Sequence, residues 1–199
     1  METTIKSLFD ESHDIYFTGD IEESTLEKLE KDICEIKQRD EKIIRNNKAI
    51  LESSGIYAYD FKLPEINIYL STYGGVVYDG LAIYDLIKSL TRKYTVNVKV
   101  VGKAMSCGIF ALQAGTKRYG SKNSTYLYHD ISGFKIGKLE DIKESTEEWK
   151  RLRDKIDDII LSRTKITREM LDEVVKCKKD WFMDAETALE LGVIDEIID

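Results

Sequence analysis

The feature that most constrains the fold is an order of strand, glycine turn and helix that occurs twice in the middle of the chain. A strand-like run at Ile66–Leu70 is followed by a break at Gly74–Gly75, and a helical apolar pattern follows in residues 77–91. A second such run, Val96–Val101, leads through a glycine-containing turn into a short apolar helix at Ile109–Ala114. This alternation predicts an α/β domain with a largely parallel sheet, whose functional groups gather at the strand ends.

Further elements are expected on both sides of this core. A capping-box pattern at Ser24–Glu27 predicts the start of an amphipathic helix whose apolar pattern weakens after Ile36. Residues 38–62 are expected to form the tail of that helix and then a loop or hairpin. The remaining expected elements are strands at 14–18 and 125–129, a long amphipathic helix at 139–163, and two shorter helices capped by Thr167 and Asp184, with Gly192 closing the second.

The composition bounds the class of protein. A chain of 199 residues with 42% hydrophobic residues has the length of one domain and enough apolar surface to fold without disulfides or metal. A net charge of −7 argues against a nucleic-acid partner, which usually requires a basic excess. No apolar stretch approaches 18 residues and the first twenty residues contain no apolar run, so neither a membrane span nor a signal peptide is expected.

Cysteine and histidine are scarce. The three cysteines are odd in number and far apart, which favours free thiols in a reducing compartment, and a cytoplasmic location is expected. The two histidines, His13 and His129, do not have the spacing of zinc ligands, so we expect no metal and no cofactor. If a histidine acts as a general base here, only these two residues are available.

Ser106 is the first candidate for chemistry, because it lies on the turn between a strand and a helix. Such a turn exposes the hydroxyl at the sheet edge, and the amides that follow it can bind an oxyanion. The spacing from Gly102 to Gly108 differs from the Gly-x-Ser-x-Gly motif of hydrolases, so a simple helix-capping serine stays open. Cys107 is a rival nucleophile, with a small buried thiol as its alternative.

A serine nucleophile also needs a base, an orienting acid and oxyanion donors. His129 at the end of a strand is the better of the two histidines, and the turn at Gly74–Gly75 could bring one amide close to a substrate or be only a tight turn. For the acid, the residues alone do not decide between Asp180, Asp130 and Asp184. The glycine patterns match neither a dinucleotide fingerprint nor a P-loop.

The ordered set of these segments resembles the proteolytic subunit of the Clp protease, a serine peptidase. The resemblance extends over nearly the whole chain. Its matching segments are Ile15–Gly19, Glu65–Gly75, Asp79–Asp85, Gly102–Gly108, Tyr128–His129, Asp180–Ala185 and Leu191–Asp195.

The resemblance implies a fold, a site and an activity. The fold would be the crotonase-like ββα superhelix with a protruding handle helix. The triad would be Ser106, His129 and Asp180, with the backbone amides of Gly75 and Cys107 as the oxyanion hole. The protein would be a serine endopeptidase that hydrolyses peptides and unfolded proteins through an acyl-enzyme.

The resemblance also implies an assembly. One peptidase domain would span residues 1–199, with a head at 14–131 and 164–199 and a handle strand and helix at 132–163. Heptameric rings, stacked in pairs through the handles, would form a homo-oligomeric tetradecamer with an internal chamber. An AAA+ unfoldase ATPase would feed this chamber.

Several departures from the family pattern indicate a divergent member, for which a phage origin is one option. Tyr73 stands where the family has proline, Asp130 follows the histidine, Lys178–Lys179 replaces an acidic-basic pair, and 38–62 reads as an insertion. Two other functions therefore stay open: a catalytically silent ring or assembly scaffold of the same fold, and a crotonase-fold enzyme that acts on acyl-CoA.

Overall fold

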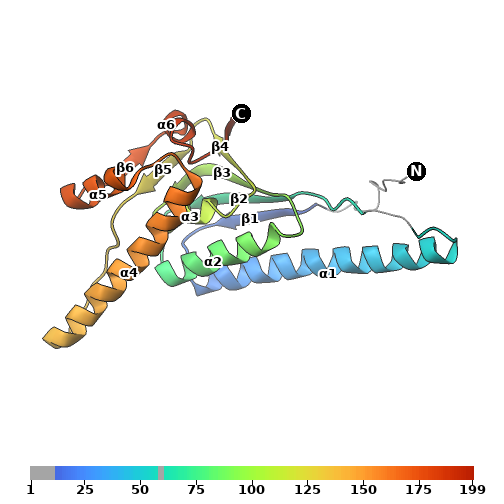
Figure 1. The fold of residues 1–199 in the computed structure, drawn as a ribbon, viewed down its shortest axis with the longest axis horizontal. Helices are drawn as coiled ribbons and strands as arrows, with labels where there is room; N and C mark the ends of the chain where they lie inside the picture. The colour runs from blue at the N-terminus through green and yellow to red at the C-terminus, as the bar shows by residue number, and fades with distance from the viewer. Residues whose placement is uncertain (1–11, 58–60) are drawn as a thin grey trace.

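A computed structural model describes residues 12–57 and 61–199 as a seven-stranded sheet with helices packed against it (Figure 1). The strand order is β1-β2-β3-β4-β7, with β5 beside the end of β3 and β6 beside β5. All pairs are parallel except β5–β6. In chain order the elements are β1 (Asp14–Thr18), α1 (Glu23–Ser53), β2 (Ile66–Thr72), α2 (Val77–Leu90), β3 (Val96–Met105), α3 (Cys107–Leu112), β4 (Lys117–Ser121), β5 (Thr125–Tyr128), α4 (Leu139–Arg163), α5 (Arg168–Cys177), β6 (Trp181–Met183), α6 (Ala185–Glu190) and β7 (Glu196–Ile198).

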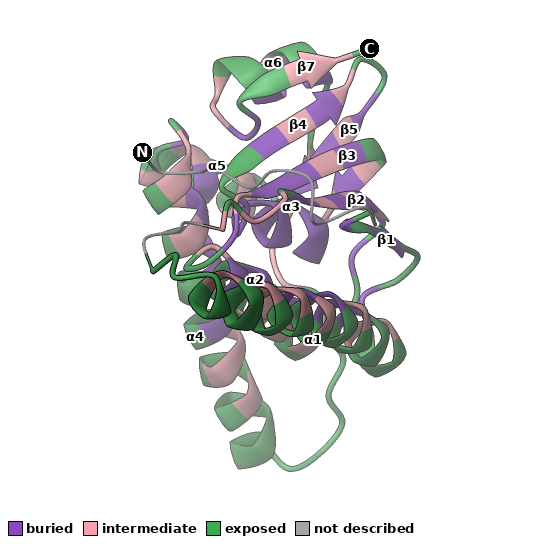
Figure 2. Ribbon diagram, turned by 90° about the vertical axis from the view of Figure 1, so that its right-hand side faces the viewer, coloured by how far each residue is buried: buried purple, intermediate pink, exposed green. Residues whose placement is uncertain are grey.

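The core lies between the sheet and the helices, and besides residues of α1, α2 and α3 it includes Ile156 and Ile160 of α4 and Leu171 of α5. Strand residues alternate in burial, and Ile15 and Phe17 of β1 and Ile68 of β2 are buried members of the core. Figure 2 shows buried segments along the strands of the sheet. On the other face Tyr16 stacks on Tyr69 with ring centroids 5.0 Å apart. The predicted α/β class with a largely parallel sheet is therefore confirmed.

Helix α1 is longer than its apolar pattern predicts. Ile33 and Ile36 are buried, and the helix then continues past the body of the molecule to Ser53 (Figure 1). Asp40 extends the buried face, because its carboxylate accepts a hydrogen bond from Tyr94 Oη at 2.9 Å and lies 3.0 Å from His13 Nε2. A polar anchor of this kind is invisible to a search for apolar periodicity.

One prediction at the start of α1 is wrong in detail. The helix begins at Glu23, and its first turn is closed by the Glu22 amide, which donates to Thr25 Oγ1 at 3.0 Å, rather than by a box at Ser24–Glu27. The helix tail expected after residue 38 is confirmed, and of the loop or hairpin expected to follow it the loop is found, since residues 54–57 and 61–65 contain no strand; residues 58–60 lie outside the described part.

Helix α4 projects away from the sheet at the opposite end from the tip of α1 (Figure 1). Its predicted bounds, 139–163, are confirmed, and its C-terminal half buries Leu152, Ile156 and Ile160. The handle strand that the resemblance implies is not formed, since residues 129–138 contain neither helix nor strand. Within the described ranges, none of the helices is both long enough and apolar enough to cross a bilayer.

Candidate active site

Ser106 has an unusual backbone conformation. It lies between β3 and α3 with φ 52° and ψ −118°, and Lys178 is the one other non-glycine residue with positive φ in the described chain. A residue in such a region costs about 1–3 kcal/mol and persists only where its surroundings hold it, which occurs most often at functional sites. Here the Ser106 amide donates to Leu127 O of β5 at 3.0 Å, and its carbonyl accepts from Ile109 N at 3.1 Å.

The Gly74–Gly75 turn packs directly against Ser106. Both glycines have positive φ, 100° and 152°. A Cβ on Gly74 would lie 2.6 Å from Ser106 Cβ, and one on Gly75 would overlap the carbonyl oxygen of Ile21. Ile21 also pairs with the turn through its amide, which donates to Gly74 O at 2.7 Å. The turn therefore requires glycine at both positions and is held next to the serine.

Cys107 contributes to this arrangement as a buried thiol. Its Sγ donates to Gly75 O at 3.3 Å, and burial raises the pKa of the thiol. A thiol that stays protonated is a poor nucleophile, so the structure favours the packing interpretation of Cys107 over the catalytic one. The same contact ties the Gly75 peptide to the start of α3.

A small cavity brings four of the five predicted site residues together. Gly75, Ser106, Cys107 and His129 line it. Its apolar wall consists of Val77 of α2, Phe110 of α3 and Ile156 of α4, together with Ile131 from the segment that follows β5. The sequence pattern did not single out these wall residues, because they come from separate elements and carry no motif.

His129 lies immediately after β5, between two pockets. It lines the cavity that contains Ser106 and also a second, adjacent pocket that includes Asp180. Its Nδ1 is hydrogen-bonded to the backbone carbonyl of Asp130, and within the described residues the ring makes no hydrogen bond to Ser106 or Asp180. Catalytic hydrogen bonds are often long or unformed without substrate.

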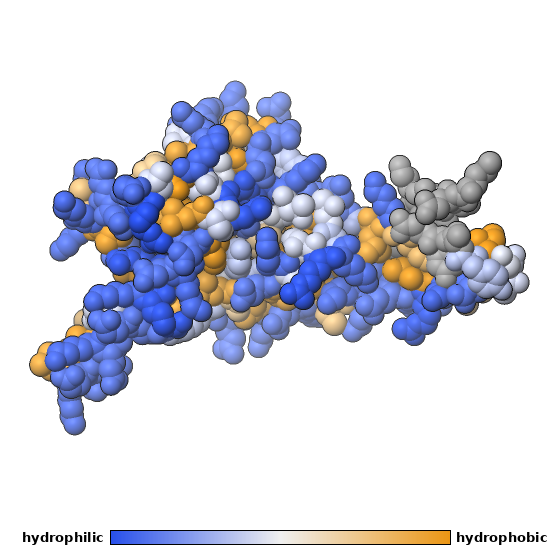
Figure 3. All heavy atoms as spheres, viewed as in Figure 1, coloured by the Kyte–Doolittle hydropathy of each residue, from blue (hydrophilic) through white to orange (hydrophobic). Residues whose placement is uncertain are grey.

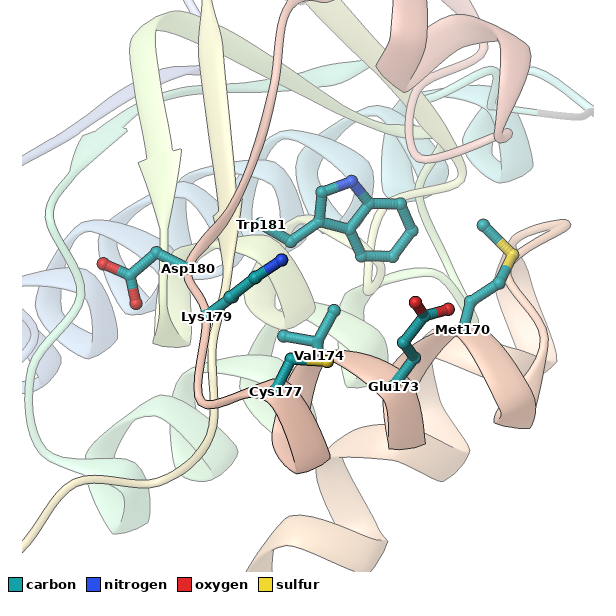
Figure 4. A pocket seen from close by; sticks show the side chains of 7 residues that line it. All are labelled: Met170, Glu173, Val174, Cys177, Lys179, Asp180 and Trp181. Carbon is teal, nitrogen blue, oxygen red and sulfur yellow. The ribbon is translucent and has the colours of Figure 1, made fainter.

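Asp180 is exposed at the start of β6. Its carboxylate is directed away from the indole of Trp181, although both residues line a pocket over α5 (Figure 4). Lys178, with φ 49°, ends α5 in a left-handed conformation and turns the chain toward Asp180. Within the described part of the chain, the Asp180 carboxylate has neither a hydrogen bond nor an ion pair.

The two competing acids have other partners. Asp184 caps α6 by accepting from Thr187 N at 2.8 Å, and this bonding lowers the pKa of its carboxyl group. Asp130 accepts from Ile131 N at 2.8 Å and lies 3.6 Å from Arg153 Nη1. Of the three acids left open by the sequence, Asp180 alone has an unengaged carboxylate beside His129.

His13 is buried with Asp40 at the start of β1 and lines neither of the pockets around His129. Among the residues described, no group of three or more His, Cys, Asp or Glu side chains is placed to bind a metal ion.

Comparison with known proteins places this arrangement in a family. The sequence model of the family described as Clp protease matches residues 58–199, which is more than half of the chain. The chain belongs to the Clp protease family. The ATP-dependent Clp protease proteolytic subunit of Deinococcus radiodurans is 38% identical over 137 residues, which cover 68% of this chain and 65% of that relative.

The Clp protease fold is also seen in a solved structure. A mutant of ClpP1 from Listeria monocytogenes matches with a TM-score of 0.71 and 24% identity, covering 94% of this chain and 91% of that one. This likeness confirms the crotonase-like α/β fold expected from the sequence. The family match begins at residue 58, so β1 and α1 lie outside it although they belong to the same sheet and core.

Proposed function

We propose that this Clp protease family member is a serine endopeptidase that cleaves peptides and unfolded proteins. The observation that carries the proposal is the cavity in which Ser106, held at positive φ, meets His129 and the peptides of Gly75 and Cys107. A nucleophile, a base and two backbone amides around one cavity are the parts that acyl transfer requires. A catalytically silent scaffold would not need the strained serine conformation.

The chemistry follows from the positions of these groups. Ser106 Oγ attacks the substrate carbonyl while His129 takes the hydroxyl proton, and the amides of Gly75 and Cys107 stabilise the oxyanion. His129 then gives the proton to the leaving amine, which produces an acyl-enzyme on Ser106. Water, deprotonated by His129, hydrolyses that ester. In this mechanism the Asp180 carboxylate replaces the Asp130 carbonyl as the acceptor at His129 Nδ1 and then orients the imidazole.

The working unit in this proposal is a homo-oligomer of heptameric rings stacked in pairs. Its support is the handle, taken as residues 132–163, which projects from the head and carries exposed apolar side chains at its tip. Figure 3 shows apolar atoms at this tip. The exposed residues are Phe134, Ile136, Leu139 and Ile142. Apolar side chains at a protruding tip are costly in a monomer and are expected to be covered by another copy.

The proposal extends to a partner and a compartment. The name of the Deinococcus relative describes an ATP-dependent protease, and we assign an AAA+ ATPase partner to this chain on that basis. The three cysteines are free thiols, which suits the reducing cytoplasm.

The test uses short fluorogenic peptides and acyl-CoA thioesters with the wild type and with Ser106→Ala. A peptidase cleaves the peptides, loses this activity in the variant and leaves the thioesters intact. Thioester turnover would support the acyl-CoA alternative, and an absence of any turnover in correctly assembled rings would support the scaffold. Native mass measurement of the same samples reports the number of copies, and a monomer would contradict the ring assembly.

A further inference from the structure

Helix α1 carries a line of charged residues along one exposed side, which we call the charged stripe. Its members are separated by whole numbers of helical turns, so they lie on the same side of the helix. All of them are exposed, and the stripe extends for about 38 Å at 1.5 Å per residue. The signs are segregated, with an acidic half near the start of the helix and a basic half toward its end. The acidic half is Glu23, Glu27 and Glu30, and the basic half is Lys37, Arg45 and Lys48.

Most charges of the stripe have no partner of opposite sign within the chain. Among the described residues, the three acids, Lys37 and Arg45 form no ion pair, and Lys48 lies 3.8 Å from Glu52 of the same helix. Glu23 and Glu27 are neighbours of like charge four positions apart, an arrangement that destabilises an isolated helix. A partner that carries the opposite order of charges would relieve this repulsion.

The middle of the stripe borders a groove between α1 and α2. The groove has a volume of about 400 Å³, and its lining includes Ile33, Cys34 and Lys37 of α1 and Leu86 of α2. Ile33 is buried and Leu86 packs against the core, so the floor of the groove is apolar. A second helix lying along the stripe would cover this floor, and the burial of apolar surface would add to the attraction between charges.

The order of the charges indicates what that second helix is. A helix with acids first and bases later is complementary to a second copy of itself in the antiparallel orientation, because a two-fold rotation places each acidic half on the other basic half. In one register Glu23 then faces Lys48 of the second copy, and Glu27 faces its Arg45. Both pairs have the same midpoint, just beyond Cys34, and therefore belong to one two-fold axis.

We propose that the charged stripe is a self-complementary interface at which the α1 helices of two copies of this chain pair in antiparallel orientation. The inference goes beyond the proposed peptidase function and does not depend on it. It is also separate from the contact proposed for the handle, whose exposed apolar residues belong to residues 134–142. Copies joined through their handles would be linked through α1 to a further copy.

Cys34 allows this interface to be measured directly. Its exposed thiol lies beside the expected two-fold axis, whereas Cys177, the other exposed thiol, is on α5 and Cys107 is buried. In Cys177→Ser, a short bismaleimide should join Cys34 of two copies and give a covalent dimer on a denaturing gel. The control is Cys34→Ser, which should form dimers at least about tenfold more slowly, because its remaining exposed thiols are not held at a high effective concentration.

Charge reversal tests the pairing of the two halves. One variant reverses the acidic half and another the basic half, so each has a stripe of a single sign and should crosslink through Cys34 at least about tenfold more slowly than the parent at low salt. Mixed together, the two variants should form a heterodimer at about the parent rate, because their stripes are opposite in sign. In the Cys177→Ser background, the variants are Glu23→Lys with Glu27→Lys and Glu30→Lys, and Lys37→Glu with Arg45→Glu and Lys48→Glu.

A matched control reverses three exposed acids of α4, which changes the net charge as much as reversal of the acidic half does, and it should crosslink at the parent rate. These changes are Glu140→Lys, Glu144→Lys and Glu147→Lys. Circular dichroism shows whether each variant is folded. The interface would be overturned if Cys34 reacted no faster than the control thiol, if either single-sign variant crosslinked with itself as fast as the parent, or if two folded variants failed to crosslink with each other.

The peptidase assay on the same samples keeps the two proposals apart. A protein that forms the Cys34 dimer but cleaves no peptide would remove the peptidase proposal and leave the interface standing. A protein that cleaves peptides but forms no Cys34 dimer would remove the interface alone.

Discussion

The two sides of His129 are built very differently. On the side that we call the nucleophile half, Gly75, Ser106 and Cys107 are packed and hydrogen-bonded to one another and to neighbouring strands. On the side that we call the acid half, Asp180 is exposed at the end of a left-handed turn and has no partner among the described residues. In the proposed mechanism, the difference means that the nucleophile and the oxyanion donors are already organised within one chain, whereas the carboxylate of Asp180 still has to move to the histidine.

The largest effect is expected in the nucleophile half. Ser106→Ala should reduce peptide hydrolysis by about 10⁶-fold, since the residue that forms the acyl-enzyme is removed. Alanine fits the space of the serine Cβ, so circular dichroism and native mass should match the wild type. Residual activity above about one hundredth in pure variant protein would show that another residue is the nucleophile.

The acid half is tested by Asp180→Asn. If Asp180 orients His129 during turnover, kcat should fall by about 10⁴-fold, because the amide favours the wrong imidazole tautomer. The matched controls are Asp130→Asn and Asp184→Asn, which change the other two acids considered for this role. A larger loss in either control than in Asp180→Asn would transfer the role of the acid.

The oxyanion turn should respond less strongly. Gly75→Ala places a Cβ against the carbonyl of Ile21 and displaces one donor, so kcat should fall by about 10²–10³-fold. Gly55→Ala is the control: it also has positive φ, but its Cβ would meet nothing within 4 Å. Equal losses of activity in the two variants would mean that backbone strain alone is responsible.

The smallest expected effect is a difference in the rates at which two cysteine thiols are alkylated, and it is measured without a peptidase assay. Cys107 reports on the nucleophile half and Cys177 on the acid half, and burial raises the pKa of the Cys107 thiol. Iodoacetamide at pH 8, followed by peptide mapping, should modify Cys177 at least about tenfold faster than Cys107. Comparable rates would mean that the nucleophile half opens as readily as the acid half.

The same contrast separates what the sequence could predict from what it could not. Helix α4 carries an unbroken apolar stripe, and Thr167 and Asp184 are strong N-caps, so these bounds were predicted from local signals. Strands β6 and β7 have three residues each, too few for alternation to be recognised, and they form because β5 and β4 offer pairing partners.

In the candidate site, too, local features could be predicted and contacts between distant segments could not. The Ser106 turn and Gly74–Gly75 are local features and could be predicted from the residues. The choice among Asp130, Asp180 and Asp184 depends on which carboxylate is unengaged beside His129, and that is decided by chain segments far apart in the sequence. The hydrogen bond from Tyr128, which lines the Ser106 cavity, to Asp157 of α4 spans 29 positions and leaves no motif.

The central claim, that Ser106 is an activated nucleophile, is tested most directly by mapping the adduct of a fluorophosphonate probe with peptide-level mass spectrometry. The account predicts a single adduct on Ser106 in the wild type, slower formation of that adduct in Asp180→Asn and none in Ser106→Ala. An adduct on another residue, or labelling that survives Ser106→Ala, would contradict it.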